Sequence, residues 1–179
     1  MFAYGQTGSG KTHTVMGIIE MLAEDIFTKK EEHTRLHLTF TQLLGNTMTD
    51  LLVEEGEETV SVMEDKFGKI NMVGAREEAV SRGDEVLAHT QRALARRSTA
   101  TTLKNDTSSR SHAIIRLRCE NTAVRAAEDG YLYLIDLAGS ENAGDSQFHD
   151  KTRLQETREI NKSLMCLKDC IRNRCQEGL

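Results

Sequence analysis

The sequence predicts an α/β fold: a three-layer sandwich in which helices flank a mixed, mostly parallel central sheet. Three observations carry this prediction. A glycine-rich loop joins a short apolar strand to a helix at the N-terminus, strand-like and helix-like apolar periods alternate along the chain, and a continuous apolar strand ends in an aspartate. With 179 residues, 38% of them hydrophobic, the chain is long enough for one domain with its own core.

The N-terminal loop reads Gly5-Gln6-Thr7-Gly8-Ser9-Gly10-Lys11-Thr12, which matches the phosphate-binding pattern G-x-x-x-x-G-K-[ST]. Its glycines let successive backbone N–H groups point into one concavity, where they bind phosphate oxygens. Lys11 would reach the β- and γ-phosphates, and the hydroxyl of Thr12 would ligate Mg²⁺. The N-terminal end of the following helix adds a partial positive charge. The alternative is a Gly/Ser/Thr loop without a ligand.

The first half of the chain predicts a helix, a strand and a hairpin. The helix runs from Lys11 to about Lys30, because apolar residues recur there at helical spacing, namely Ile18, Ile19, Leu22, Ile26 and Phe27. Residues 36–41 alternate between apolar and polar, as a half-buried strand does, and Gly45-Asn46 marks a turn. The acidic run 54–58 is expected to be a solvated loop, and residues 60–70 a hairpin with its turn near 65–68.

The second half predicts two more helices and two strands. A helix opens at 81–84 with Asp84 as its cap, and residues 115–119 alternate as a strand. Residues 131–135 form a continuous apolar strand, expected to be buried on both faces, that ends at Asp136. A last helix begins near Leu154 with one apolar stripe: Ile160, Leu164, Leu167 and Ile171.

Composition limits the classes of partner. The net charge of −5 argues against a general nucleic-acid binder, and no apolar run approaches membrane-spanning length, so neither nucleic acid nor a membrane is expected as a partner. The four cysteines lack the spacing of a secreted disulfide framework and are expected to be reduced, in a soluble cytosolic protein. Cys166 and Cys170 are expected to be buried thiols, and metal ligation by this pair is the weaker alternative.

Two further segments could sense a bound phosphate. Asp136 ends an apolar strand, where a carboxylate can hold the water shell of Mg²⁺. Gly139 has no Cβ and can bring its N–H close to a γ-phosphate. The polar segment 105–112 offers hydroxyls, and Arg110 could pair with Glu141 to lock the two loops together. Each feature taken alone is an ordinary strand end or surface loop.

Taken together, these motifs resemble the kinesin motor domain. The resemblance rests on the phosphate-binding loop with its flanks, Tyr4 to Thr14; on Asn105-x-x-Ser108-Ser109-Arg110-Ser111-His112; and on Asp136-Leu137-Ala138-Gly139-Ser140-Glu141. Ile160-Asn161-Lys162-Ser163-Leu164 is a fourth match, to the main microtubule-binding helix of the family. The middle of the chain, 36–102, matches in outline.

The resemblance implies a P-loop NTPase that binds ATP and Mg²⁺. The implied nucleotide-binding set is Gly5, Gln6, Thr7, Gly8, Ser9, Gly10, Lys11, Thr12 and His13. Mg²⁺ would be held by Thr12, Ser109 and, through water, Asp136. The implied catalytic set is Ser108, Arg110, Gly139 and Glu141, in which Glu141 accepts the proton of the attacking water through a water relay. His112 either contacts the nucleotide site or closes the loop structurally.

The resemblance also implies microtubules as the partner and a cytoplasmic, cytoskeletal location. Residues 151–174 carry seven basic and three acidic residues inside an acidic chain, which suits an electrostatically steered contact with acidic tubulin. An ordinary solvated helix face is the alternative. The residues expected to contact the microtubule are Lys151, Arg153, Arg158, Lys162, Lys168 and Arg172.

Residues 1–179 are therefore expected to be a partial motor domain, incomplete at both ends, because the phosphate loop begins at residue 5. The expected activity is a microtubule-stimulated ATPase coupled to movement or to remodelling of microtubule ends. Residues 142–152 and 167–172 also resemble internal-motor kinesins that depolymerise microtubules. The alternative is a truncated, non-motile remnant that only binds tubulin or another partner. A P-loop GTPase is excluded because no Asn-Lys-x-Asp motif is present.

Overall fold

The computed structural model describes residues 1–29, 31–54, 56, 58–99, 110–124, 127–140 and 151–177, apart from the side chains of 99, 151–157 and 174–177. The elements, in chain order, are β1 (Phe2–Ala3), α1 (Lys11–Lys29), β2 (Thr34–Leu44), β3 (Thr47–Asp50), β4 (Thr59–Glu64), β5 (Ile70–Val73), β6 (Glu78–Val80), α2 (Gly83–Thr99), β7 (His112–Asn121), β8 (Gly130–Asp136) and α3 (Lys151–Glu177).

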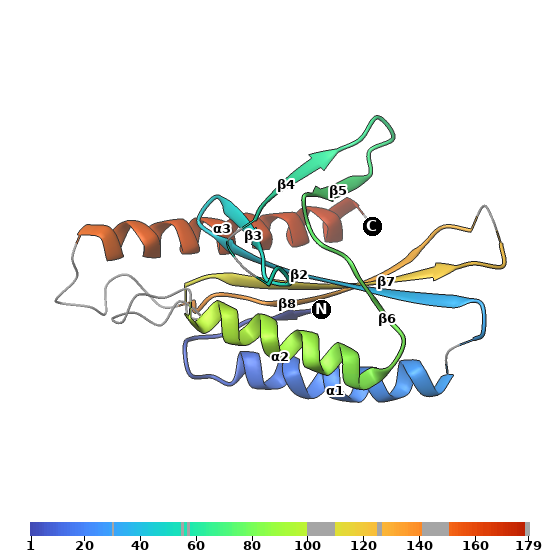
Figure 1. The fold of residues 1–179 in the computed structure, drawn as a ribbon. Coiled ribbons are helices and arrows are strands. Elements are labelled where there is room, and N and C mark those ends of the chain that lie inside the picture. Colours follow the sequence, from blue (N-terminus) through green and yellow to red (C-terminus); the bar gives the residue numbers. More distant parts are fainter. Residues whose placement is uncertain are drawn as a thin grey trace.

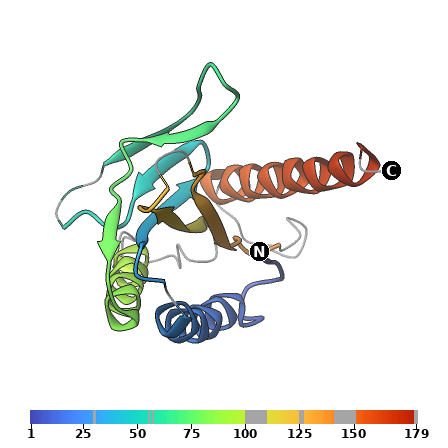
Figure 2. The ribbon, with the colours of Figure 1, turned by 90° about the vertical axis from the view of Figure 1, so that its right-hand side faces the viewer.

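Helices cover both faces of the central sheet. In Figure 1, α1 and α2 lie below the sheet and α3 lies above it, and the turned view in Figure 2 shows the same separation. This arrangement confirms the predicted three-layer α/β sandwich.

The strand directions differ from the prediction. The sheet runs in the order β1-β8-β7-β2-β3-β4-β5, and β6 pairs with β2. Among the described strands, β1 and β8 are parallel and the other pairs are antiparallel. The expectation of a mostly parallel sheet is therefore wrong for this part of the chain. Short connections join β2 to β3, β4 to β5 and β7 to β8, and such connections return the chain antiparallel to itself.

The main core lies between the sheet and the layer formed by α1 and α2. Leu36, Leu38 and Phe40 alternate along β2 and are buried, as the half-buried strand pattern predicts. They share one apolar cluster with Val15 and Ile19 of α1. The other predicted stripe residues of this helix are half-buried against the same cluster: Ile18, Leu22, Ile26 and Phe27.

The β4–β5 hairpin turns where the sequence predicts. One carboxylate oxygen of Asp65 accepts the N–H groups of Phe67 and Lys69, at 2.8 and 3.0 Å, and this closes the turn. Of the acidic run before the hairpin, Glu54 and Glu58 are exposed, as a solvated loop requires. Residues 55 and 57 lie outside the described residues.

The start of α2 differs from the prediction by its cap. The helix begins at Gly83, so Asp84 lies inside its first turn. The exposed N–H of Ser81 donates to the carboxylate of Glu85 at 2.7 Å. A carboxylate inside the first turn still favours the helix through its dipole, but it does not hold the capping position.

Strand β8 is buried on one face where burial on both was expected. Leu134 is buried, whereas Tyr131 and Tyr133 are 38% and 37% exposed. The apolar residues of α3 pack on Ile135 and on the residues after β8 instead, so the tyrosines lie beyond the surface that this helix covers. Continuous apolar character therefore overstated the burial of this strand.

The cysteine prediction also fails in one respect. Cys119, Cys166 and Cys170 are free thiols, as expected, but all three are exposed, whereas Cys166 and Cys170 were expected to be buried. The described residues contain no group of three or more His, Cys, Asp or Glu side chains that could hold a metal ion. Among the described helices none is long and apolar enough to cross a membrane.

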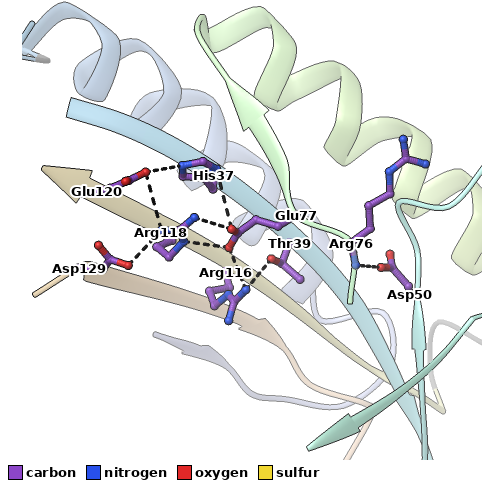
Figure 3. Close-up of polar contacts among 9 residues, drawn as sticks. All are labelled: His37, Thr39, Asp50, Arg76, Glu77, Arg116, Arg118, Glu120 and Asp129. Carbon is purple, nitrogen blue, oxygen red and sulfur yellow. Dashed lines mark hydrogen bonds and ion pairs between the residues drawn. The ribbon is translucent and has the colours of Figure 1, made fainter. Parts of the chain in front are cut away.

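A charged cluster fixes the segment before β6 onto the sheet, at the end of β8 opposite Asp136. Figure 3 shows Arg118 between Glu77 and Asp129. Its guanidinium donates to both oxygens of Glu77, at 3.0 and 2.5 Å, and to Asp129 at 3.0 Å. Burial opposes ionisation of Glu77, but the hydrogen bonds and charge of Arg118 outweigh it and lower the pKa of Glu77. This cluster stabilises the path into α2.

Candidate nucleotide site

The parallel pair of β1 and β8 brings the phosphate loop (residues 5–12) to the end of β8. Ala3 pairs with Asp136, and the N–H of Ser140 donates to the carbonyl of Gly5 at 3.2 Å. Parallel strands end at the same edge of a sheet, so the loop and residues 136–140 lie next to each other. The sequence motifs are thus assembled at one edge.

The phosphate loop has the backbone conformation that its glycines permit. Gly8 and Gly10 have φ values of 78° and 84°, in the left-handed region that favours glycine. A Cβ at either position would meet no atom within 4 Å, so conformation rather than space requires glycine there. Residues 6–10 are exposed, and the ammonium of Lys11 donates to the carbonyl of Gln6 at 2.9 Å. The loop is therefore accessible to a ligand.

Asp136 lies at the centre of the site. Its Oδ2 accepts the hydroxyl of Thr12 at 2.7 Å and a guanidinium N–H of Arg97 at 2.7 Å. The side chain is almost completely buried, and its Oδ1 has no hydrogen-bond partner among the described residues. A buried carboxylate oxygen of this kind needs a donor, because an unsatisfied polar group costs about 1–3 kcal/mol.

These residues fit a Mg²⁺ ion. Carboxylate and hydroxyl oxygens are the ligands that Mg²⁺ accepts while it keeps several waters. The predicted ligands Thr12 and Asp136 are joined by a hydrogen bond, and the orphan Oδ1 of Asp136 can accept a hydrogen bond from a metal-bound water. Ser109, the third predicted ligand, lies outside the described residues.

Arg97 is a site residue that the sequence reasoning missed. Its side chain is 1% exposed, and besides Asp136 it binds Ser111, through Nε to Oγ at 3.1 Å and through Nη2 to the carbonyl at 2.6 Å. A signal for it was present. Arg97 continues the buried stripe of α2 at helical spacing, and a cation on a buried stripe requires an anionic partner. The other members of that stripe are Val86, Thr90 and Ala93.

His112 connects the residues after β8 to α3. Its Nδ1 accepts the N–H of Ala138 at 3.1 Å, and its Nε2 lies 2.8 Å from the hydroxyl of Ser163. That hydroxyl donates to the carbonyl of Ile160 at 2.7 Å, so the imidazole must donate through Nε2–H. Burial and then the charge of Arg97 lower the pKa of His112, which favours the neutral imidazole over the charged one. His112 therefore links the segment after β8 to α3, which supports the structural one of its two predicted roles.

Helix α3 docks through a small apolar cluster beside this histidine. Ile160 and Leu164 are buried against Leu137 and Ala138. Leu167 is half-buried on the same cluster, but Ile171 is 47% exposed. The predicted apolar stripe is thus confirmed for its first three positions and ends one turn early.

Part of the predicted catalytic set lies outside the described residues, namely Ser108 and Glu141. Arg110 is half-buried and has interactions within the protein, and Gly139 is buried directly after the cluster that docks α3. The Arg110–Glu141 bridge remains a prediction. His13 is exposed at the start of α1.

The predicted basic face of α3 is exposed where its side chains are described. Arg158 and Lys162 are exposed one helical turn apart. Arg172 pairs with Asp169 at 3.0 Å, and the ammonium of Lys168 lies 5.3 Å from the centroid of the Tyr4 ring. The side chains of 151 and 153 lie outside the described ones. Near its start the described basic face of α3 therefore presents exposed cations, whereas near its end Lys168 and Arg172 contact other residues of the protein.

Comparison with known proteins identifies the family. The family model of the kinesin motor domain matches residues 1–177. The chain is 38% identical over 175 residues to diatom spindle kinesin-1 of Cylindrotheca fusiformis and 39% identical over 181 residues to the kinesin-like protein KIN-13B of Arabidopsis thaliana. Each match covers 96% of this chain, but 27% and 26% of the relatives, so the chain spans about a quarter of their length.

Solved structures show the same fold. A fast kinesin superposes with a TM-score of 0.75 at 33% identity, over 89% of this chain and 49% of that structure. A KIF14 dimer with AMP-PNP in complex with a microtubule gives a TM-score of 0.74 at 31% identity, over 93% of this chain and 52% of that one. The sequence motifs, the fold and these matches agree: the chain belongs to the kinesin motor-domain family.

Proposed function

We propose that the chain binds Mg²⁺ and ATP at its phosphate loop and hydrolyses ATP in a cycle that microtubules accelerate. The observation that carries this proposal is the placement of Asp136. It is bonded to Thr12 of the phosphate loop, keeps an orphan buried oxygen, and lies two residues before Ala138, which His112 links to α3. The kinesin family consists of microtubule-stimulated ATPases.

Nucleotide binding falls to the phosphate loop. Its N–H groups and Lys11 bind the phosphate oxygens, and Lys11 exchanges its present acceptor, the carbonyl of Gln6, for phosphate. Thr12, Ser109 and Asp136 hold Mg²⁺, the last through water. When bound, the ion supplies positive charge that neutralises the phosphate oxygens.

Hydrolysis depends on positioning a water against the γ-phosphate. In this proposal Ser108 orients the water and Glu141 accepts its proton through a water relay. Arg110 pairs with Glu141 to close the site, and the N–H of Gly139 contacts the γ-phosphate. Preorganised donors of this kind stabilise developing charge without reorganisation during the reaction.

Coupling to the microtubule runs through α3. A change in the backbone at Gly139 reaches the neighbouring Ala138, which His112 ties to Ser163 of α3. The helix docks on a small apolar cluster, so a modest change there can shift it. The exposed cations of α3 then contact acidic tubulin, as opposite charges steer and orient the encounter. They are Lys151, Arg153, Arg158, Lys162 and Arg172, whereas Lys168, the sixth cation of the predicted set, contacts Tyr4.

The output of the cycle is movement along microtubules or remodelling of their ends. The resemblance of residues 142–152 and 167–172 to internal-motor kinesins keeps the second possibility in the proposal. The competing function is a non-motile module that binds tubulin without hydrolysing ATP. The turnover assay below separates this module from the ATPase.

The test is ATP turnover by the purified protein with and without microtubules. Wild-type protein is expected to show turnover that microtubules stimulate. Lys11→Ala should abolish turnover, because the γ-phosphate loses its main cationic contact, while Lys29→Ala on the same helix serves as the matched control. Microtubule binding without any turnover would reject the ATPase and support the binding module.

A further inference from the structure

Tyr4 and Lys168 make a contact that the proposed mechanism does not use. Tyr4 follows β1 and immediately precedes the phosphate loop, and Lys168 lies on α3. The ammonium of Lys168 is 5.3 Å from the centroid of the Tyr4 ring, within the range of a cation–π contact. The polar side chains of Ser140 and then Lys168 lower the pKa of the Tyr4 hydroxyl, and all three residues line one cavity. Three segments of the site therefore meet at this ring.

The backbone around Tyr4 is fixed to the segment after β8. The N–H of Leu137 donates to the carbonyl of Ala3, and the N–H of Ser140 donates to the carbonyl of Gly5, both at 3.2 Å. The position of the Tyr4 ring therefore depends on the phosphate loop and on the segment after β8. The position of the Lys168 ammonium depends on α3. The distance between this ring and this ammonium therefore changes when α3 shifts relative to the loop.

The contact borders an open cavity of about 340 Å³. The cavity separates the phosphate-loop side from α3, and its lining includes Tyr4, Ser140, Asn161, Leu164, Met165 and Lys168. Tyr4 is 53% exposed, so ring and ammonium can part without displacing packed neighbours. An exposed contact beside open space can break and re-form easily as α3 shifts.

We propose that Lys168 is a positioning residue that ties α3 to the phosphate loop through Tyr4. This inference rests on the proposed function and deepens it. Lys168 contacts the nucleotide side of the protein, whereas Arg158 and Lys162 contact the microtubule. Loss of the contact lets the helix move without a matching change in the loop, so microtubules accelerate nucleotide release less.

A double-mutant cycle tests the contact. The variants are Lys168→Met, Tyr4→Leu and the double variant, with Lys29→Met as the control that removes an exposed cation elsewhere. The measurement is the release rate of a fluorescent ADP analogue with saturating microtubules, divided by the rate without them. Each single variant should lower this ratio about two- to fivefold, the equivalent of an exposed cation–π contact, and the double variant should lower it no further.

Two results would overturn the proposal. Losses that multiply in the double variant would show that the residues act independently. If Lys168→Met needed a higher microtubule concentration for half-saturation but kept the wild-type ratio of release rates at saturation, Lys168 would be a microtubule contact instead.

A second measurement separates this inference from the proposed ATPase. Hydrogen exchange without nucleotide or microtubules should be faster in Lys168→Met than in wild type, both in residues 4–14 and in α3. Exchange that changes in α3 alone would contradict the link, whether or not the protein hydrolyses ATP. Absence of microtubule-stimulated turnover in wild type would instead reject the proposed function. The hydrogen-exchange result would still test the contact between Lys168 and Tyr4, because it needs no turnover.

Discussion

The guanidinium of Arg97 lies 2.7 Å from Oδ2 of Asp136, and the two residues are 1% and 2% exposed. The same carboxylate oxygen accepts the hydroxyl of Thr12. The C-terminal end of α2 is thereby joined to the end of β8 directly beside the phosphate loop. One buried ion pair consequently supports both the fold and the candidate nucleotide site.

Removing Arg97 should destabilise the protein strongly. Arg97→Ala leaves Asp136 buried without its counter-ion, and breaking such a pair costs about 3–5 kcal/mol. Arg92→Ala, at an exposed position five residues earlier on α2, should change stability by no more than about 0.5 kcal/mol. Urea denaturation of both variants measures the difference, and similar losses for the two would argue against a central role of the pair.

His112 should make stability depend on pH. Burial and Arg97 lower its pKa in the folded state, so protons bind the unfolded chain more readily. The stability that neutral His112 contributes is fully present above the ordinary histidine pKa of about 6.5, and it is lost as the pH falls through the lower pKa of the folded state. Urea denaturation between pH 7.5 and 5 should show a shallower decline for His112→Gln than for wild type. Parallel declines would contradict the assignment.

Two glycines should respond to alanine with opposite signs. Gly10 has a φ of 84°, so Gly10→Ala should cost about 1–2 kcal/mol of stability even though its Cβ meets no atom. Gly17 lies inside α1 with open space around its Cα, so Gly17→Ala should stabilise the protein by about 0.5–1 kcal/mol. Thermal unfolding of both variants gives the comparison. Stabilisation by alanine at position 10 would show that the loop does not need its left-handed backbone.

The exposed basic face of α3 should contribute a salt-dependent attraction to microtubules. Arg158→Ala with Lys162→Ala should weaken co-sedimentation with microtubules, and the loss should shrink as salt rises, since screening already removes the attraction. Lys29→Ala with Arg92→Ala removes the same charge from the opposite helix layer and should bind as wild type does. Equal weakening by both pairs would indicate a non-specific effect of net charge.

The parts of this molecule that were predictable from the sequence are local in the chain. The phosphate loop, the turn at 65–68 and the docking stripe of α3 depend on residues within one or two turns of each other. Strand direction depends on which distant strands pair, and a segment's own pattern does not fix that. The mostly parallel sheet was expected from the predicted α/β phosphate-loop fold, but the described pairs are mostly antiparallel.

The site followed the same rule. Asp136 and Thr12 were recognisable from their motifs, and the structure places them in one hydrogen bond. Arg97 belongs to no motif. Its place on the buried stripe of α2 indicates that it needs an anionic partner, but only the fold shows that this partner is Asp136, 39 residues away. The exposure of Tyr131 and Tyr133 was also unpredictable from their own segment, because it depends on where α3 packs.

The most direct test of the account is calorimetric titration of the purified protein with ADP in the presence and absence of Mg²⁺, for wild type and Lys11→Ala. The account predicts binding that requires Mg²⁺ and weakens about 10- to 100-fold in Lys11→Ala, since a hydrogen bond to a charged group contributes roughly 1.5–3 kcal/mol. Absence of binding by the folded wild-type protein, or equal binding by the two proteins, would contradict the assignment of the phosphate loop and of the nucleotide site built on it.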